Sequence, residues 1–341
     1  MGDDAPVVEI QQSHFVPLLP WQRGEWQRLT QRWPNLPHGL LLSGTVGTGK
    51  RRFADRLTAW LLCEARSHMP DGACGRCVSC QWLRAGTHPN LLRISREVDA
   101  KGKQSKQIKI DQIRGLLPFV QQTSAGWRVV IVEPAEAMNM AAANALLKTL
   151  EEPSANVLLL LVADQPLQLP ATIRSRVQQL PLGRIDRDQA CAYVQDDAQV
   201  DAARASVLLG LAGHAPLAAV ALAGSEMVAA RADWVADWQA LCAQRVDVLS
   251  VSARWQKRLP FADFLALIAH MLRDVIALHL GQPVVQTDLS LDALQQTTQL
   301  PALLALSAQW PQLMQAQAQN VQVGLVCDSF IKQLAAAGQC A

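Results

Sequence analysis

The chain has 341 residues, of which half are hydrophobic and 18% are charged. This composition is typical of a packed globular protein and excludes a disordered chain, and the length leaves room for two or three domains. The formal net charge of +2 is too small to indicate nucleic-acid binding by itself, so any DNA contact has to come from local basic patches.

The sequence predicts neither a signal peptide nor a membrane-spanning segment. The first ten residues, "MGDDAPVVEI", lack the basic and then apolar order of a signal peptide. The longest strongly apolar run, "VLLLLVA" at residues 157–163, is far shorter than the roughly 20 residues of a membrane-spanning helix. We therefore expect a soluble, cytoplasmic protein with no membrane partner.

The first motif along the chain has the pattern of a phosphate-binding loop. Residues 39–43 are an apolar predicted strand, residues 50–63 have helical apolar spacing, and the turn between them contains "GTVGTGK". Glycines let backbone N–H groups approach a phosphate, and the lysine reaches the terminal phosphates of a nucleotide. A chance glycine-rich turn is the alternative. The predicted phosphate contacts are Gly44, Gly47, Gly49 and Lys50.

The loop departs from an active nucleotide site in two places. Arg51 stands where a serine or threonine would bind Mg²⁺, and a guanidinium has only donors and cannot coordinate a cation. In the later segment "VVIVEPAEAM", Glu133 takes the place of the magnesium-binding aspartate and Pro134 that of the water-orienting glutamate. Glu133 can still reach a metal, but Pro134 has no acid–base chemistry. The two defects together predict no ATP hydrolysis in this loop and argue against ATP binding there, and nucleotide binding without hydrolysis stays open.

Four of the eight cysteines are clustered in residues 63–80 with the spacing C-x10-C-x2-C-x2-C. Each x2 spacing lets neighbouring thiolates face one ion, as in tetrahedral zinc sites, whereas a disulfide framework would spread its cysteines more evenly. We predict a structural Zn²⁺ site, with an iron–sulfur cluster or four unrelated thiols as alternatives. His68 and His88 are expected on the surface rather than among the ligands. The predicted zinc ligands are Cys63, Cys74, Cys77 and Cys80.

Residues 96–114 gather basic side chains. A solvated, flexible loop accounts for this composition, and a contact with the DNA backbone is the alternative. The basic residues of the segment are Arg96, Lys101, Lys103, Lys106, Lys109 and Arg114.

Two further apolar runs, residues 127–134 and 157–163, are predicted strands. The Ala-rich segment between them is a predicted helix that ends at Pro153. Strands that alternate with helices indicate a parallel α/β sheet covered by helices.

After about residue 180 the strand signals disappear. One amphipathic helix is predicted from residue 261 to a C-cap at Gly281, and a final helix at about 321–337. We therefore predict an α/β domain over residues 1–180, a small helical domain over 181–224 and an all-helical domain over 225–341.

Several of these segments together resemble bacterial clamp-loader subunits, which belong to the AAA+ family. The resemblance covers the whole first domain, fits the helical remainder less specifically, and implies an AAA+ module of the P-loop type, a helical lid and a C-terminal collar for oligomerisation. It rests on the cysteine module and on the segments "PLLPWQRGEWQRL", "LPHGLLLSGTVGTGK", "AGTHPN", "MAAANALLKTLEEP" and "LPATIRSRVQQL".

The resemblance implies a place in DNA replication. Such a subunit joins ATPase subunits and the delta subunit in a five-membered ring that loads the sliding clamp onto primed DNA. This loader works within the DNA polymerase III holoenzyme, a DNA-directed DNA polymerase and nucleotidyltransferase of the bacterial cytoplasm, at the nucleoid through the replisome. With its degenerate loop, this chain is expected to be a noncatalytic member with no ATPase activity of its own.

The resemblance also implies one catalytic role in trans. In the family, the Ser-Arg pair before the last strand supplies an arginine finger to the ATP of a neighbouring subunit, which matches Ser175 and Arg176. Pairing of Arg176 with a local carboxylate is the alternative. The lid segment "GLAGHAPLAAVAL" carries no phosphate-sensing arginine, and the polar sensor after the third strand falls on Ala163 or Asp164.

Two other functions remain open at this point. A catalytically active ring ATPase of the clamp-loader type would need the altered loop still to turn over ATP. A stand-alone zinc-dependent nucleic-acid-binding protein would need a far more basic face than this composition offers.

Overall fold

The protein is described by a computed structural model. It divides into two compact units, with Gln189 in the first and Ala190 in the second, and each unit is described by itself. The described residues are 14–69, 71–99, 102, 104–122, 126–310, 313 and 323–338.

The first unit is built on one parallel sheet. Its strands are β1 (Gly39–Ser43), β2 (Leu91–Ile94), β3 (Arg128–Val132), β4 (Val157–Ala163) and β5 (Gln178–Pro181). They lie in the order β2-β3-β4-β1-β5. β3 and β4 are buried along their whole length and β1 along all but its last residue, as expected for central strands of a parallel sheet that is covered on both faces.

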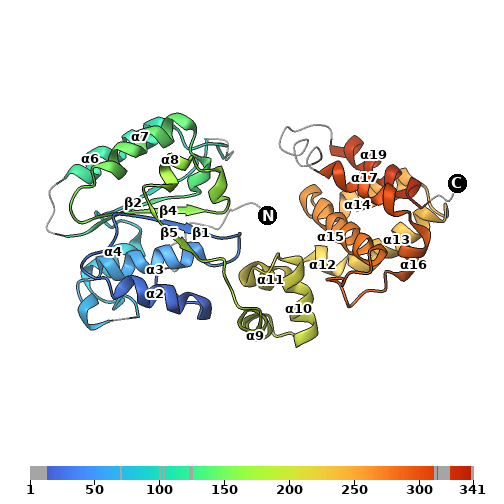
Figure 1. Cartoon of the computed structure of the whole chain (residues 1–341), viewed down its shortest axis with the longest axis horizontal. Coiled ribbons are helices and arrows are strands. Elements are labelled where there is room, and N and C mark those ends of the chain that lie inside the picture. The colour runs from blue at the N-terminus through green and yellow to red at the C-terminus, as the bar shows by residue number, and fades with distance from the viewer. Residues whose placement is uncertain are drawn as a thin grey trace. The chain divides into compact units, whose positions relative to one another are not determined.

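Helices cover both faces of this sheet (Figure 1). On one face, α2, α3 and α4 pack a core around Trp26, Phe53 and Leu57, and on the other, α5 to α8 pack around Ile113 and Leu146. The helical segments of this unit are η1 (Pro20–Gln22), α2 (Arg23–Thr30), α3 (Lys50–Leu62), η2 (Arg66–His68), α4 (Val78–Ala85), α5 (Ile110–Arg114), α6 (Leu116–Gln121), η3 (Ala135–Ala137), α7 (Met140–Glu151), η4 (Pro166–Gln168) and α8 (Ala171–Arg174).

The strand register places the functional loops along one edge of the sheet. Ser43 at the end of β1 lies opposite Ala163 at the end of β4, and Val132 at the end of β3 lies opposite Leu161. Because parallel strands share one carboxyl edge, the segments that follow β1, β3 and β4 are neighbours there, which is where ligands bind in open α/β sheets.

The second unit is helical in its described residues. Trp234, Trp255 and Phe264 pack together in its core, with ring centroids 5.1 to 5.6 Å apart. Its helices are α9 (Arg187–Ala198), which begins in the first unit, α10 (Ala202–Leu211), α11 (Pro216–Ala223), α12 (Glu226–Ala229), α13 (Arg231–Cys242), α14 (Val248–Arg258), α15 (Phe261–His279), α16 (Asp292–Thr297), α17 (Leu300–Ala308) and α19 (Val323–Ala336).

Among the described residues, no single helix has the length and apolar composition to cross a membrane. Within the same part of the chain, α10 and α11 have that length and composition only when taken together, and they are bent by 110° at the break between them.

The predicted alternation of strands and helices is confirmed. α15 ends as predicted, with Gly281 just beyond it at a φ of 64°, a left-handed value that glycine adopts without strain. The last helix covers 323–336 of the predicted 321–337, and residues 321 and 322 lie outside the described set. β2 was not predicted, since this short edge strand is half-exposed. The domain boundaries near 180 and 224 stay predictions.

Candidate functional site

The phosphate loop joins β1 to α3 at the carboxyl edge of the sheet. Gly47 and Gly49 have φ angles of 87° and 86°, values at which a side chain would be strained. The Trp21 indole N–H donates to the Thr48 carbonyl at 3.0 Å, and the Gln22 amide donates to the Gly49 carbonyl at 2.9 Å. The loop is therefore held in shape by side chains of η1, which packs beside it.

Lys50, the predicted phosphate-binding lysine, is paired within the chain. Its ammonium lies 2.6 Å from the Asp164 carboxylate and donates to the Thr45 carbonyl at 2.8 Å. The Lys50 side chain is only 4% exposed, so the attraction is stronger than for a pair in open water. An anion that approached Lys50 would have to displace this carboxylate.

The two residues that depart from an active site are bonded to each other. Arg51 Nε donates to Glu133 Oε1, and the Glu133 side chain is 18% exposed. The sequence left open whether Glu133 could reach a metal. In the structure, its carboxylate instead accepts from a guanidinium that brings a fixed positive charge to the place where Mg²⁺ would be expected.

Asp164 is the polar group that faces the loop after β4. Of the two positions that the sequence left open, Ala163 is a buried strand residue, whereas Asp164 contacts Lys50. Glu136 fixes this turn, because its Oε1 accepts from the backbone N–H groups of Asp164 and Gln165 at 2.9 and 3.0 Å. Sequence reasoning missed Glu136, although an acidic residue three positions after the β3 glutamate was a visible signal.

Arg176 lies just beyond α8 and has a local partner. Its Nε and Nη2 lie 2.8 and 2.7 Å from Glu151 Oε1, and Nη1 donates to the Thr172 carbonyl at 3.1 Å. The local pairing considered as an alternative is therefore present. Arg176 is 37% exposed and Glu151 is 49% exposed, and exposed pairs contribute only about 0–1 kcal/mol, so the guanidinium can leave Glu151 at small cost.

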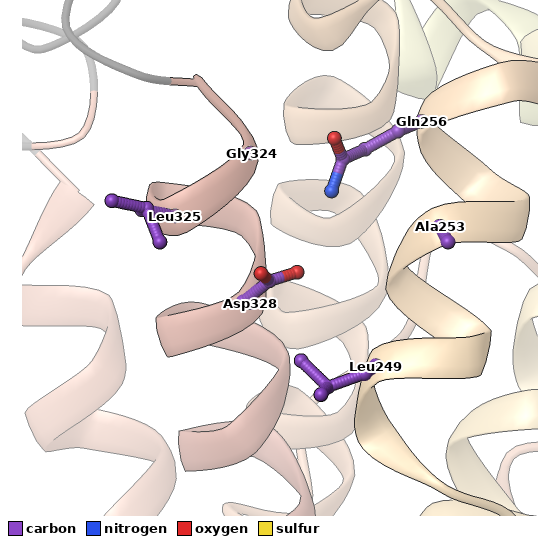
Figure 2. Close-up of a pocket in the computed structure, with 6 residues that line it drawn as sticks. All are labelled: Leu249, Ala253, Gln256, Gly324, Leu325 and Asp328. Atoms are coloured by element: carbon purple, nitrogen blue, oxygen red, sulfur yellow. The ribbon is translucent and has the colours of Figure 1, made fainter.

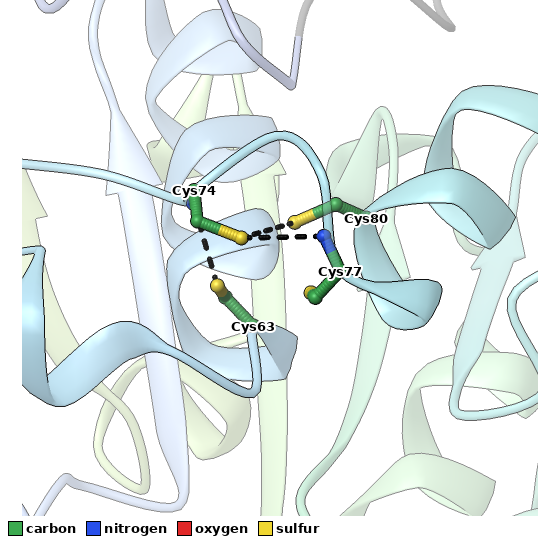
Figure 3. Close-up of side chains that lie close together, drawn as sticks. All are labelled: Cys63, Cys74, Cys77 and Cys80. Atoms are coloured by element: carbon green, nitrogen blue, oxygen red, sulfur yellow. Dashed lines mark hydrogen bonds between the residues drawn. The ribbon is translucent and has the colours of Figure 1, made fainter.

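The four predicted metal ligands converge (Figure 3). Cys63 lies at the end of α3, Cys74 in the segment between α3 and α4, Cys77 at the start of α4 and Cys80 within α4. All four Sγ atoms lie within 4.8 Å of one another, with Cys74 and Cys80 at 3.9 Å. A tetrahedral zinc site with Zn–S bonds of about 2.3 Å separates its sulfurs by about 3.8 Å, so this set can hold one such ion with small adjustments.

The thiols of the cluster have unequal acidity. The pKa of Cys74 is lowered to about 6, chiefly because its Sγ accepts from the backbone N–H groups of Arg76 and Cys77. Burial raises the pKa of Cys63 and of Cys80. A bound metal ion would offset that burial, since it binds the thiolate form and releases the proton.

His88 was expected on the surface, and this prediction is wrong, whereas His68 is exposed as predicted. His88 Nδ1 accepts from the Asn90 backbone N–H at 3.0 Å, and its Nε2 lies 2.8 Å from Ser79 Oγ. Ser79 in turn donates to the Leu62 carbonyl at 2.7 Å. This chain of hydrogen bonds ties the residue before Cys63 to the helix that carries Cys80.

The basic segment at 96–114 is only partly described, since Lys101 and Lys103 lie outside the described residues. Lys109 lies 3.5 Å from Glu97, and Arg114 lies 3.7 Å from Asp111. These are exposed pairs, so a role in DNA contact stays a prediction.

The helical unit has a groove of about 430 Å³ between α14 and α19. Figure 2 shows the two helices side by side, with Gln256 and Asp328 directed toward the space between them. Leu249 on α14 is 61% exposed and Leu325 on α19 is 63% exposed. The groove therefore combines two exposed leucines with two polar side chains.

Comparison with known proteins identifies the family. A family model described as "DNA polymerase III, delta subunit" matches residues 25–186. The DNA polymerase III subunit delta' of Pseudomonas aeruginosa is 40% identical over 244 residues, which cover 70% of this chain and 71% of that protein. The chain belongs to the DNA polymerase III delta-prime family.

Three further proteins are similar to this delta-prime family member. The subunit delta' of Escherichia coli is 32% identical over 60% of each chain. The subunit tau of Salmonella typhimurium is 36% identical over 45% of this chain and 22% of that protein. A DNA polymerase III gamma subunit-related protein from Thermotoga maritima superposes with a TM-score of 0.46 at 15% identity, covering 93% of this chain and all of that one.

Family membership confirms the expected role as a subunit of the DNA polymerase III clamp loader. The parallel five-stranded sheet confirms the predicted α/β domain, and the described residues that follow it are helical, as predicted. The roles of individual residues in this delta-prime family member, including the loop residues and Arg176, are separate questions.

Proposed function

We propose that this chain is a noncatalytic clamp-loader subunit that supports the ATPase of its neighbours. In this proposal it joins ATPase subunits and delta in a five-membered hetero-oligomeric ring in the cytoplasm, and the ring loads the sliding clamp onto primer–template DNA. The Arg51–Glu133 ion pair is the observation that carries the noncatalytic role. In this pair the carboxylate of Glu133, which stands at the magnesium-binding position, is bonded to the fixed positive charge of Arg51.

The active role in this proposal belongs to Arg176. An arginine that a neighbour's ATP meets in trans stabilises the charge that develops on the transferring phosphoryl group. Its exposure and its weak surface pairing with Glu151 support this role, since the side chain can reach outward without leaving a buried charge behind.

Metal binding by the cysteine cluster completes the proposal. Four sulfur donors favour Zn²⁺ or an iron–sulfur cluster over harder metals. We propose Zn²⁺ in a structural role, held by Cys63, Cys74, Cys77 and Cys80, because four ligands leave no open position for catalysis.

The function is tested with the reconstituted loader and with the isolated chain. The isolated wild-type chain should show no ATP turnover, and Arg176→Ala should lower the DNA-stimulated ATPase activity of a loader that still assembles. Single-turnover rates at the adjoining site should fall on the order of 10³-fold, as for other arginine fingers.

Glu151→Gln is the matched control for Arg176→Ala. It breaks the same ion pair but keeps the guanidinium, so it should leave the loader rate nearly unchanged. If Glu151→Gln reproduces the loss, Arg176 acts through its local pair and not on ATP. Turnover by the isolated chain that Lys50→Ala abolishes would instead favour the active ring ATPase.

A further inference from the structure

The phosphate loop carries positive charge that is already occupied. Lys50 has its ammonium on Asp164 and Thr45 and is almost fully buried, and Arg51 has its guanidinium on Glu133. In a nucleotide-binding loop, the lysine contacts phosphate, and a metal ion bridges phosphate and protein. Here both kinds of contact are made by carboxylates of the same chain.

We propose that Asp164 and Glu133 hold the phosphate loop shut against nucleotide, with Asp164 acting as an internal anion on Lys50. The proposal rests on the noncatalytic function proposed above and deepens it, since it names the residues that keep ATP out. The loop then has a structural task, which is to hold the corner between β1 and α3 while its charges neutralise each other.

Charge explains why ATP is excluded. A nucleoside triphosphate at this loop would lie close to the carboxylates of Asp164 and Glu133. It would also have to separate Lys50 from Asp164, which lies 2.6 Å away. Like charges at short range in a partly buried site repel strongly. Arg51 offers no ligand position to Mg²⁺, so the metal that normally relieves this repulsion has no place on the loop side.

Asp164 is positioned firmly enough to act as an internal anion. Its backbone N–H and that of Gln165 both donate to Glu136, so the turn after β4 is fixed from the side of β3. The Asp164 carboxylate itself does not hold the loop backbone, because Trp21 and Gln22 bond the carbonyls of Thr48 and Gly49 independently. Removing the charge of Asp164 should therefore free Lys50 without collapsing the loop.

The test measures nucleotide binding by calorimetry on the full chain. The wild type should bind ATP weakly or not at all, with or without Mg²⁺, whereas Asp164→Asn should bind Mg-free ATP at least about ten-fold more tightly, a gain of about 1.4 kcal/mol. Adding Lys50→Ala to Asp164→Asn should abolish the gain. Asp111→Asn, at a carboxylate that is 84% exposed in the same unit, is the matched control and should behave as the wild type.

Either of two results would overturn the proposal. One is a wild-type chain that binds ATP as tightly as Asp164→Asn does, and the other is an Asp164→Asn variant that has the circular dichroism of the wild type and still does not bind ATP. A second measurement uses the wild type alone and does not depend on the variant folding. Acetylation of Lys50, followed by mass spectrometry, should be slow and unchanged by millimolar ATP. Protection of Lys50 by ATP would show that nucleotide reaches it and would refute the internal anion.

The outcomes separate this inference from the proposed function. If Asp164→Asn shows no gain in affinity for ATP but Arg176→Ala still slows the loader, only the proposed role of Asp164 as an internal anion fails. If the isolated wild type hydrolyses ATP, the noncatalytic function fails first. ATP binding without hydrolysis in Asp164→Asn supports both the inference and the proposed function. In that variant Arg51 still cannot bind Mg²⁺, and Pro134 still cannot orient the attacking water.

Discussion

Two ion pairs of the first unit differ in how easily they open. Lys50 is 4% exposed in its pair with Asp164, whereas Arg176 is 37% exposed in its pair with Glu151. Breaking a buried pair leaves an uncompensated charge, but an exposed pair is replaced by water at little cost. The same chemistry therefore gives one closed contact at the loop and one side chain that is available to a neighbour.

His88 gives a prediction about pH at the scale of one residue. Its Nδ1 accepts a hydrogen bond, so Nε2 carries the proton toward Ser79, and burial lowers the pKa of His88 to about 4 with a smaller contribution from His14. Below about pH 6.5, the unfolded chain binds a proton at this histidine and the native chain does not. The free energy of unfolding should therefore fall as pH falls from about 6.5 to about 4.

The measurement is urea unfolding across this pH range for the wild type and His88→Gln. Glutamine can still donate toward Ser79 but does not titrate, so the variant should lose less stability over the same interval. Part of the slope should remain, because burial also lowers the pKa of His14. Parallel curves for the two proteins would contradict a neutral, buried His88.

Residue-level predictions succeeded where the signal was local in sequence. The cysteine spacing was enough to foresee that four Sγ atoms would converge, since both x2 steps lie within seven residues. The loop departures were also visible one by one. What the sequence could not give was that Arg51 bonds Glu133 and Lys50 bonds Asp164, because only the strand order of the sheet brings these distant segments together.

The cysteine module, defined as residues 63–80, is the element that we expect to depend most on a bound metal ion for its stability. It has few buried apolar side chains of its own, and Val78 and Trp82 on its helix are 50% and 44% exposed. The Cys63 and Cys80 thiols are fully buried, and they would repel each other as thiolates without a cation. A metal ion therefore accounts for the module better than its apolar contacts do.

Cys77→Ser tests the module. The wild type should carry about one Zn²⁺ per chain by mass spectrometry, and the variant should lose it together with about 4 kcal/mol of stability, at the large end of single substitutions. Cys191→Ser, at a half-exposed thiol in the other unit, should keep the metal. A metal-free wild type, or a Cys77→Ser variant with full zinc content, would refute the site.

At the scale of elements, prediction from sequence followed burial. β4 is a continuous apolar run and β3 is apolar after Arg128, because both strands are buried on both faces, so their positions could be read directly. β2 has four residues, three of them half-exposed, and it pairs only with β3. With only four residues, one of them Arg93, its apolar run is too short to distinguish it from a loop, which is why it was missed.

The two units of the molecule bury their apolar surface in different ways. The first does so on the two faces of a sheet, which leaves the carboxyl edge free for charged groups. The second packs helices around a tryptophan-rich core and leaves Leu249 and Leu325 exposed beside the groove between α14 and α19. Contiguous apolar surface marks sites of protein–protein contact, so the two leucines beside the groove make it a candidate interface of this unit.

The groove lies in the predicted C-terminal collar for oligomerisation, so we expect a neighbouring clamp-loader subunit to cover it and assembly to depend on it. Leu325→Asp removes apolar area and places a second carboxylate near Asp328, so incorporation into the loader should weaken by about ten-fold or more. Leu304→Asp, at a leucine that is 48% exposed on α17 and does not line the groove, is the matched control.

Incorporation is measured by size-exclusion chromatography of purified subunits, with unfolding curves of the isolated variants as a check on folding. The expected result is a folded Leu325→Asp chain that elutes alone and a Leu304→Asp chain that elutes with its partners. Equal incorporation of the two variants would remove the groove from the interface. Because the wild-type leucine already lies in water in the isolated chain, its replacement should cost little folding stability, and any large loss of assembly then belongs to the contact between subunits.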